Sequence, residues 1–66
     1  MKNKKFKEIL IKEIEFQTNK KNIEKVISLD YILMLYCKDF QDYINETKKI
    51  KNRKQYIEIS INYICQ

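Results

Sequence analysis

The sequence contains no histidine, glycine, proline, tryptophan or alanine, and these absences remove most familiar active sites. Without histidine, no Ser–His or Cys–His pair can activate a nucleophile. Without glycine, there is neither a phosphate-binding loop nor a dinucleotide-binding fingerprint. The two cysteines, Cys37 and Cys65, lie 28 positions apart, which matches no known spacing of zinc ligands. We therefore expect no enzymatic activity, no metal, no cofactor and no small-molecule substrate.

Long apolar runs are also absent. The longest one, from Tyr31 to Cys37, is far shorter than the roughly 20 residues that cross a bilayer. Charged residues interrupt the apolar stretch near the N-terminus, so it has no signal-type core. Two cysteines without a signal peptide do not form a disulfide scaffold. These features predict a cytoplasmic protein that does not enter a membrane.

What is present is a short, basic chain. Its 66 residues allow one domain, residues 1–66, and a chain of this size buries only about 60% of its unfolded surface. Small domains of this kind often gain stability from a partner chain. The net charge is +5, and it alternates along the sequence, with residues 1–25 basic, 26–46 acidic and 47–66 basic. This order favours a chain that folds back on itself or pairs with a second copy.

The central segment has the clearest helical pattern. Apolar residues recur at alternating spacings of three and four between Val26 and Tyr43, which predicts an amphipathic helix over residues 22–46. Asn22 is the expected N-cap, with its side chain accepting from the first-turn amides. The repeating residues are Val26, Leu29, Leu33, Tyr36, Phe40 and Tyr43.

The two terminal segments complete an expected all-α domain of three helices. The first, about 4–18, places its apolar residues on one face except for Ile11. The last, about 53–65, has both helical and alternating spacings, and Asn52 with Gln55 resembles a capping box. A lone strand would need a partner strand, which favours the helix. The alternative is an α+β homodimer in which residues 55–65 pair as a strand across the two copies.

The predicted central helix also carries apolar residues outside the repeat from Val26 to Tyr43, which we call its seam. Four apolar residues lie off the seam: Ile27, Tyr31, Met34 and Leu35. They are either covered by the terminal segments or form a docking surface for a second chain. A stripe of carboxylates, which would suit a basic groove on a partner, follows on the same helix. Its members are Asp39, Asp42 and Glu46.

A basic cluster leads into the last segment and is the best candidate for nucleic-acid contact. Its residues are Lys48, Lys49, Lys51, Arg53 and Lys54. Lysine-rich segments attract phosphate, but only one of the 14 basic residues is the arginine that base reading favours.

These patterns together predict a small protein–protein interaction module that also associates with itself. The abundance of residues with AT-rich codons and the small size favour a phage or mobile-element regulator or inhibitor of a larger host protein. A nucleic-acid-handling defence enzyme would suit the acidic stripe. The alternative is a small dimeric nucleic-acid-binding regulator that uses residues 48–54.

Overall fold

Four helices and no strand make up residues 2–65, the part of the chain that the computed structural model describes. They are α1 (Lys2–Asn19), α2 (Ile23–Tyr36), α3 (Phe40–Thr47) and α4 (Arg53–Ile64). The all-α prediction is confirmed. The three-helix count is wrong, and so is the alternative strand over residues 55–65, because those residues lie in α4 and the end that follows it.

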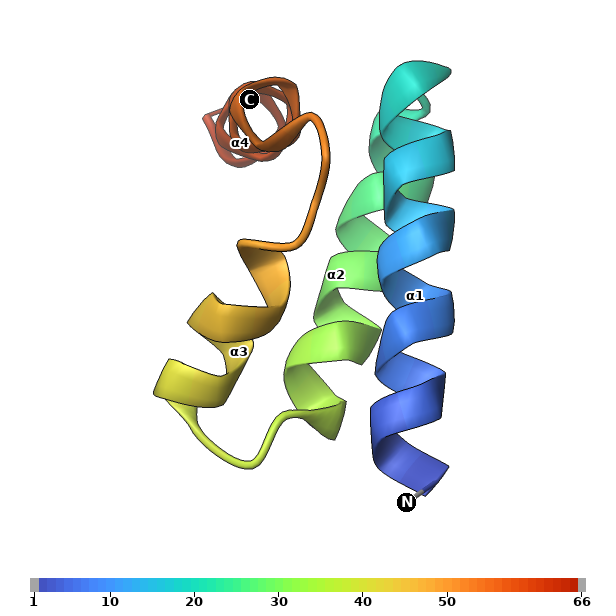
Figure 1. Cartoon of the computed structure of the whole chain (residues 1–66). Coiled ribbons are helices and arrows are strands. Elements are labelled where there is room, and N and C mark those ends of the chain that lie inside the picture. The colour runs from blue at the N-terminus through green and yellow to red at the C-terminus, as the bar shows by residue number, and fades with distance from the viewer. Residues whose placement is uncertain (1, 66) are drawn as a thin grey trace.

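The predicted helix over residues 22–46 is interrupted at residues 37–39. Cys37 and Asp39 have extended backbone, and the Cys37 amide donates to the Met34 carbonyl at 3.2 Å, which closes α2. A continuous helix of this length would extend about 37 Å, longer than the whole molecule at 35 Å. The interruption turns α3 back along the other helices, as Figure 1 shows.

Helices α1 and α2 run antiparallel and side by side (Figure 1), joined by a tight turn at Lys21. Lys21 has a φ of 57°, and the amides of Lys21 and Asn22 donate to the carbonyls of Thr18 and Gln17. This is the Schellman arrangement, in which a left-handed residue ends the helix. The chain uses lysine there in place of the usual glycine.

The core lies where α1, α2 and α4 meet. Leu10, Ile11 and Ile14 bury the inner face of α1, whereas Ile9 and Phe16 are about half exposed. The prediction that Ile11 is the outlier is therefore wrong, since residues 10, 11 and 14 share one helical face. The buried apolar residues are Leu10, Ile11, Ile14, Val26, Leu33, Ile50, Tyr56 and Ile59.

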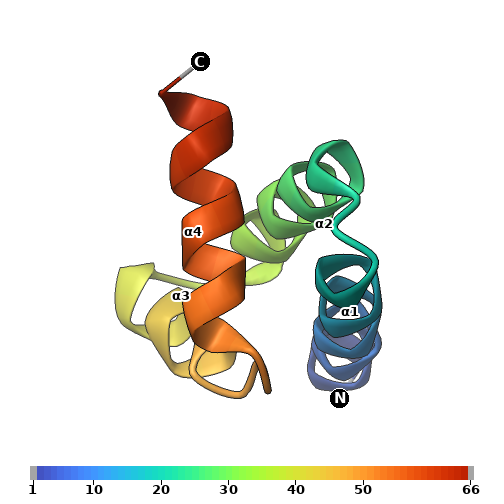
Figure 2. The ribbon, with the colours of Figure 1, turned by 90° about the horizontal axis from the view of Figure 1, so that it is seen from above.

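Helix α4 crosses α1 and α2, so that Figure 1 shows it end-on and Figure 2 shows it along its length. Tyr56 and Ile59 hold the first two turns of this helix in the core. Gln55 donates to the Thr18 carbonyl at 3.0 Å, which ties α4 to the end of α1. No helix within residues 2–65 has both the length and the apolar character needed to span a membrane.

Candidate functional site

The bend between α2 and α3 is built by two aspartates. Asp39 is the N-cap of α3, and its carboxylate accepts from the Asp42 amide at 2.7 Å. The carboxylate of Asp42 accepts in turn from the Lys38 amide at 3.1 Å. These bonds satisfy amide groups that the interruption of the helix would otherwise leave without partners. The bend is thus stabilised by side chains and needs no glycine or proline.

Exposed apolar side chains precede and follow this bend. Tyr31, Met34 and Leu35 share one face of α2 and are 56%, 48% and 62% exposed, and Phe40, the first residue of α3, is 75% exposed. Met34 and Phe40 line the same shallow hollow. We call these four residues the elbow patch. Large apolar side chains grouped in this way on a protein surface mark an interaction site more often than scattered ones do.

The four residues predicted as a docking surface on the central helix differ in their exposure. The terminal helices leave Tyr31, Met34 and Leu35 uncovered, whereas Ile27 is half-buried. Phe40 belongs to the apolar repeat predicted for the central helix, and its exposure follows from the bend that interrupts this repeat. Tyr36, also a seam residue, is 43% exposed and packs its ring 4.6 Å from that of Phe6.

The predicted acidic stripe does not form one continuous surface. Asp39 is an exposed N-cap outside the helix, whereas Asp42 is bound by the Lys7 ammonium of α1 at 2.6 Å. Hydrogen bonds from Lys7 and from the Lys38 amide hold the pKa of Asp42 below its ordinary value. The bond to Asp42 also raises the pKa of Lys7. Asp42 therefore fastens α3 to α1.

Glu46, the third member of the stripe, faces inward and is only 7% exposed. Its Oε2 atom lies 3.1 Å from the Lys49 ammonium but has no partner in hydrogen-bond geometry. The ion pair compensates part of the cost of burying this carboxylate. Of the three acidic residues, only Asp39 is exposed, and one oxygen of its carboxylate accepts the cap bond.

A cluster of one carboxylate and two phenols joins three helices. Asp30 of α2 accepts from the hydroxyl of Tyr43 on α3 at 2.8 Å and also from the hydroxyl of Tyr56 on α4. Burial and the bond to Asp30 raise the pKa of Tyr56, and burial raises that of Tyr43 to about 12. We call these residues the Asp30 cluster. Sequence reasoning missed it, although an aspartate inside the most apolar helix was a usable signal.

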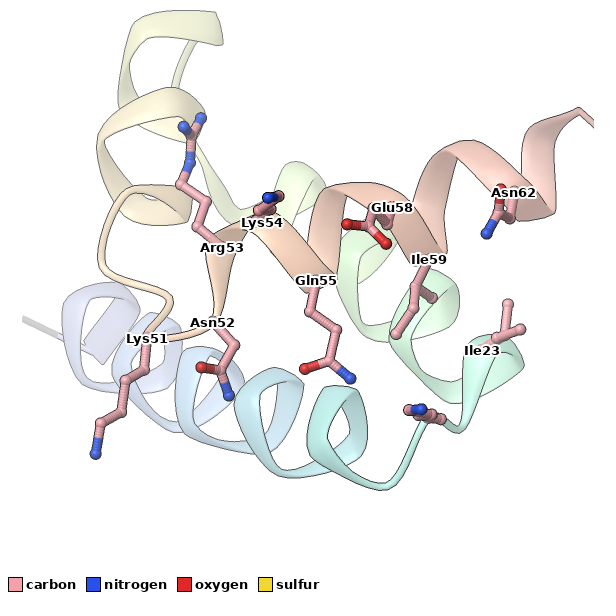
Figure 3. Close-up of a pocket in the computed structure, with 10 residues that line it drawn as sticks. Ile23, Lys51, Asn52, Arg53, Lys54, Gln55, Glu58, Ile59 and Asn62 are labelled. Atoms are coloured by element: carbon pink, nitrogen blue, oxygen red, sulfur yellow. The ribbon is translucent and has the colours of Figure 1, made fainter.

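The predicted basic cluster lies in the loop between α3 and α4 and in the first turn of α4. Lys48, Lys49, Lys51, Arg53 and Lys54 are all exposed. Figure 3 shows Lys51 and Arg53 pointing in different directions, while Asn52 and Gln55 point into the gap beside α1. Asn52 donates to the side chain of Asn19 there. The charges therefore spread over one end of the molecule instead of converging on one point.

The neighbouring hollow is lined by three of these basic residues together with Lys21, and it also contains the carboxylate of Glu58. Neither Asn52 nor Asn22 makes a side-chain cap bond, so the two predicted caps have the right positions but not the predicted bonds. The surface around the hollow suits loose attraction of a polyanion better than the binding of a single phosphate.

Nucleophilic and metal-binding groups are sparse within residues 2–65. Cys37 and Cys65 are free thiols, and burial raises the pKa of Cys37, which opposes its ionisation to the reactive thiolate. The described residues contain no group of three or more potential ligands that could hold a metal ion. The elbow patch and the basic surface are thus the sequence-predicted regions that stay exposed and could bind a partner.

No protein-family model, curated protein or solved structure matches this chain. The surfaces themselves therefore carry the functional argument.

Proposed function

We propose that this chain is a small protein-binding module that docks on a larger protein through the elbow patch. The observation that carries the proposal is the exposure of Tyr31, Met34, Leu35 and Phe40, each about half exposed or more. The first three share one face of α2, and Met34 and Phe40 line one hollow at the bend. Aromatic residues and methionine are enriched in the centres of protein interfaces, and lysine and aspartate are depleted. Lys38 and Asp39, both exposed, border the patch and supply the polar rim of such an interface.

The location of the patch favours recognition by shape. The bend places side chains from two helices on one surface, and the hydrogen bonds of Asp39 and Asp42 hold that bend in place. A partner then meets a preformed surface and loses less entropy on binding than it would with a flexible segment. Phe40 is the most prominent of the four side chains and is the expected anchor of the interface.

Site-specific photo-crosslinking tests this proposal. A photoreactive phenylalanine analogue placed at Phe40 should form a covalent adduct of defined mass with one protein in a nuclease-treated lysate of the organism that encodes the chain. The matched control carries the same analogue at Phe16, which is 53% exposed on α1. We expect the adduct from position 40 and not from position 16.

A second variant shows whether the adduct reports docking. Leu35→Glu changes a residue that is 62% exposed, so the fold should tolerate it, and the adduct should decrease by at least tenfold. Ile9→Glu, at a site with 55% exposure on α1, should leave the adduct unchanged. Equal labelling from positions 16 and 40, or an adduct that Leu35→Glu does not affect, would contradict the proposal.

Within this proposal, the partner is a larger host protein, and the chain regulates or inhibits it. Asp39 is the acidic residue that supports contact with a basic surface, because Asp42 and Glu46 are engaged within the molecule. An origin in a phage or mobile element and a defence enzyme as the target stay predictions.

A second candidate function is nucleic-acid binding by the basic cluster. The observation in its favour is that Lys48, Lys51, Arg53 and Lys54 are all exposed at one end of the molecule. Binding of a short duplex should then weaken steeply with salt, since each neutralised phosphate releases counterions. Changing the three lysines to glutamine should weaken binding at least tenfold at low salt. Unchanged affinity after those changes would show that this cluster does not bind the duplex.

A further inference from the structure

The second half of α4 extends beyond the other helices, as Figure 2 shows. Every residue from Ile61 to Cys65 is exposed, although three of the five are large and apolar. Isolated helical turns are marginally stable in water, and packing against other elements normally supplies their stability. An apolar helix end that nothing within residues 2–65 covers is therefore a candidate interface.

Three of the four exposed large apolar residues of this helix form a stripe, and Tyr63 lies outside it. Ile57, Ile61 and Ile64 follow one another at spacings of four and three and are 38%, 53% and 77% exposed. Ile44 of α3 lines the same groove as this α4 stripe, and Arg53 lines it as well. The polar floor of the groove is the Asp30 cluster, whose hydroxyls are already bonded to the carboxylate. An apolar occupant would therefore not break any of these bonds.

The charges of α4 oppose its own helix dipole. Arg53 and Lys54 occupy the first turn, where the positive end of the dipole lies, and neither forms an ion pair with another described side chain. The first turn has no acidic residue and the last turn has no basic one. A second α4 that runs antiparallel would bring its carbonyl end, the negative end of its dipole, beside these two cations. Within one α4 helix the two cations lie at the positive end of the dipole, whereas in an antiparallel pair they lie beside the negative end of the other helix.

We propose that two copies of this chain pair through antiparallel α4 helices about a two-fold axis. Setting Ile57 against Ile61 of the second copy buries both stripes and also brings Arg53 opposite Cys65 of that copy. A two-fold interface uses the same patch on both chains, and this stripe satisfies that condition. The pairing leaves the four residues of the elbow patch outside the proposed contact, so the inference does not depend on the proposed function.

Disulfide trapping tests both the pairing and its direction. In a Cys37→Ala background, Arg53→Cys should give a covalent dimer under mild oxidation, through disulfides between position 53 and Cys65 of the other copy. Within one chain these positions lie about 18 Å apart along the helix, too far for a disulfide. Cys65 alone should stay reduced, because the two Cys65 residues of an antiparallel pair would also lie about 18 Å apart.

Matched variants separate the proposed interface from random collision. Lys12→Cys, at an exposed site on α1, should crosslink to Cys65 at least tenfold more slowly than Arg53→Cys. Adding Ile61→Lys to the Arg53→Cys chain should reduce the yield at least tenfold, whereas Ile9→Lys, at a site of similar exposure, should not. Circular dichroism of each variant verifies that the helices remain.

Sedimentation of the unmodified chain, over the micromolar to millimolar range, should show a reversible shift from monomer to dimer. The small area of the stripe predicts weak pairing. A monomer throughout this range overturns the proposal. Equal rates for Arg53→Cys and Lys12→Cys overturn it as well, and rapid crosslinking of Cys65 alone would overturn the antiparallel direction. Absence of the photo-adduct at Phe40 would contradict only the proposed docking through the elbow patch.

Discussion

The carboxylate of Asp30 is held by two phenol hydroxyls, one from α3 and one from α4. Such an arrangement is favourable only while both phenols are protonated, because an ionised phenolate beside the half-buried carboxylate would be repelled. Burial, together with the bonds to Asp30, therefore favours the neutral forms of Tyr43 and Tyr56 and raises the pKa of both side chains in the folded state.

This cluster predicts a loss of stability in alkali. Tyr43 has an ordinary pKa of 10.0 in the unfolded chain and about 12 in the folded one. Its contribution is thus fully present below pH 10 and is lost as the pH rises from 10.0 towards about 12. Urea titrations across this range, followed by circular dichroism, should show a falling free energy of unfolding.

Two phenylalanine variants decide whether the Asp30 cluster causes that fall. Tyr43→Phe should lose about 1–2 kcal/mol at neutral pH and should show a shallower alkaline decline than the unmodified chain. Tyr31→Phe removes an exposed phenol and should leave the decline unchanged. If both variants decline equally, other groups determine the alkaline stability.

At the scale of the element, the bend between α2 and α3 is the feature that organises the candidate site. The α2 and α3 segments carry the same apolar spacing, which is why they read as one helix. The two aspartates at the bend, Asp39 and Asp42, replace the helical bonds that the interruption removes. The bend also allows Asp42 to reach Lys7 of α1 and Tyr43 to reach Asp30 of α2.

Asp39→Ala should therefore destabilise the chain by about 1 kcal/mol, the usual cost of losing an N-cap bond. Asn22→Ala is the matched control, because Asn22 occupies the N-cap position of α2 without making a side-chain cap bond. We expect the control to change the free energy of unfolding by less than about 0.5 kcal/mol. Chemical denaturation measures both values, and equal losses would show that the Asp39 bond contributes little.

At the scale of the whole molecule, a thin core supports a large apolar surface. Eight apolar side chains are buried within residues 2–65, and one of them, Ile50, comes from the loop between α3 and α4. This residue is 3% exposed and anchors the loop that positions the basic cluster. With so few buried side chains, each contributes a large share of the stability.

Ile50→Ala should cost about 2–4 kcal/mol, since it leaves a cavity in the core. Ile9→Ala, at a site with 55% exposure, should cost less than about 1 kcal/mol. Thermal and urea unfolding of the two variants provides the comparison. A small loss for Ile50→Ala would indicate that the loop closes over the cavity and that its contacts in the core contribute little.

The sequence by itself determined the helical character of this protein and the residue types that it lacks. Helical spacing is local, so it indicated helix in the regions where the helices lie, but it merged α2 and α3 into one and left open whether Tyr31, Met34 and Leu35 are exposed. The absence of histidine and glycine is likewise complete in the sequence. These conclusions depend only on residue types and on neighbours within about one turn.

Only the tertiary structure decided where the central helix ends and which side chains are engaged in contacts within the molecule. An aspartate followed by a helical pattern suits both an N-cap and a helix interior, so Asp39 alone did not mark the bend. Asp42 is engaged by Lys7, which lies 35 positions earlier, and Tyr56 by Asp30, 26 positions earlier. Such partners are chosen by packing between distant segments, and no local periodicity records that choice.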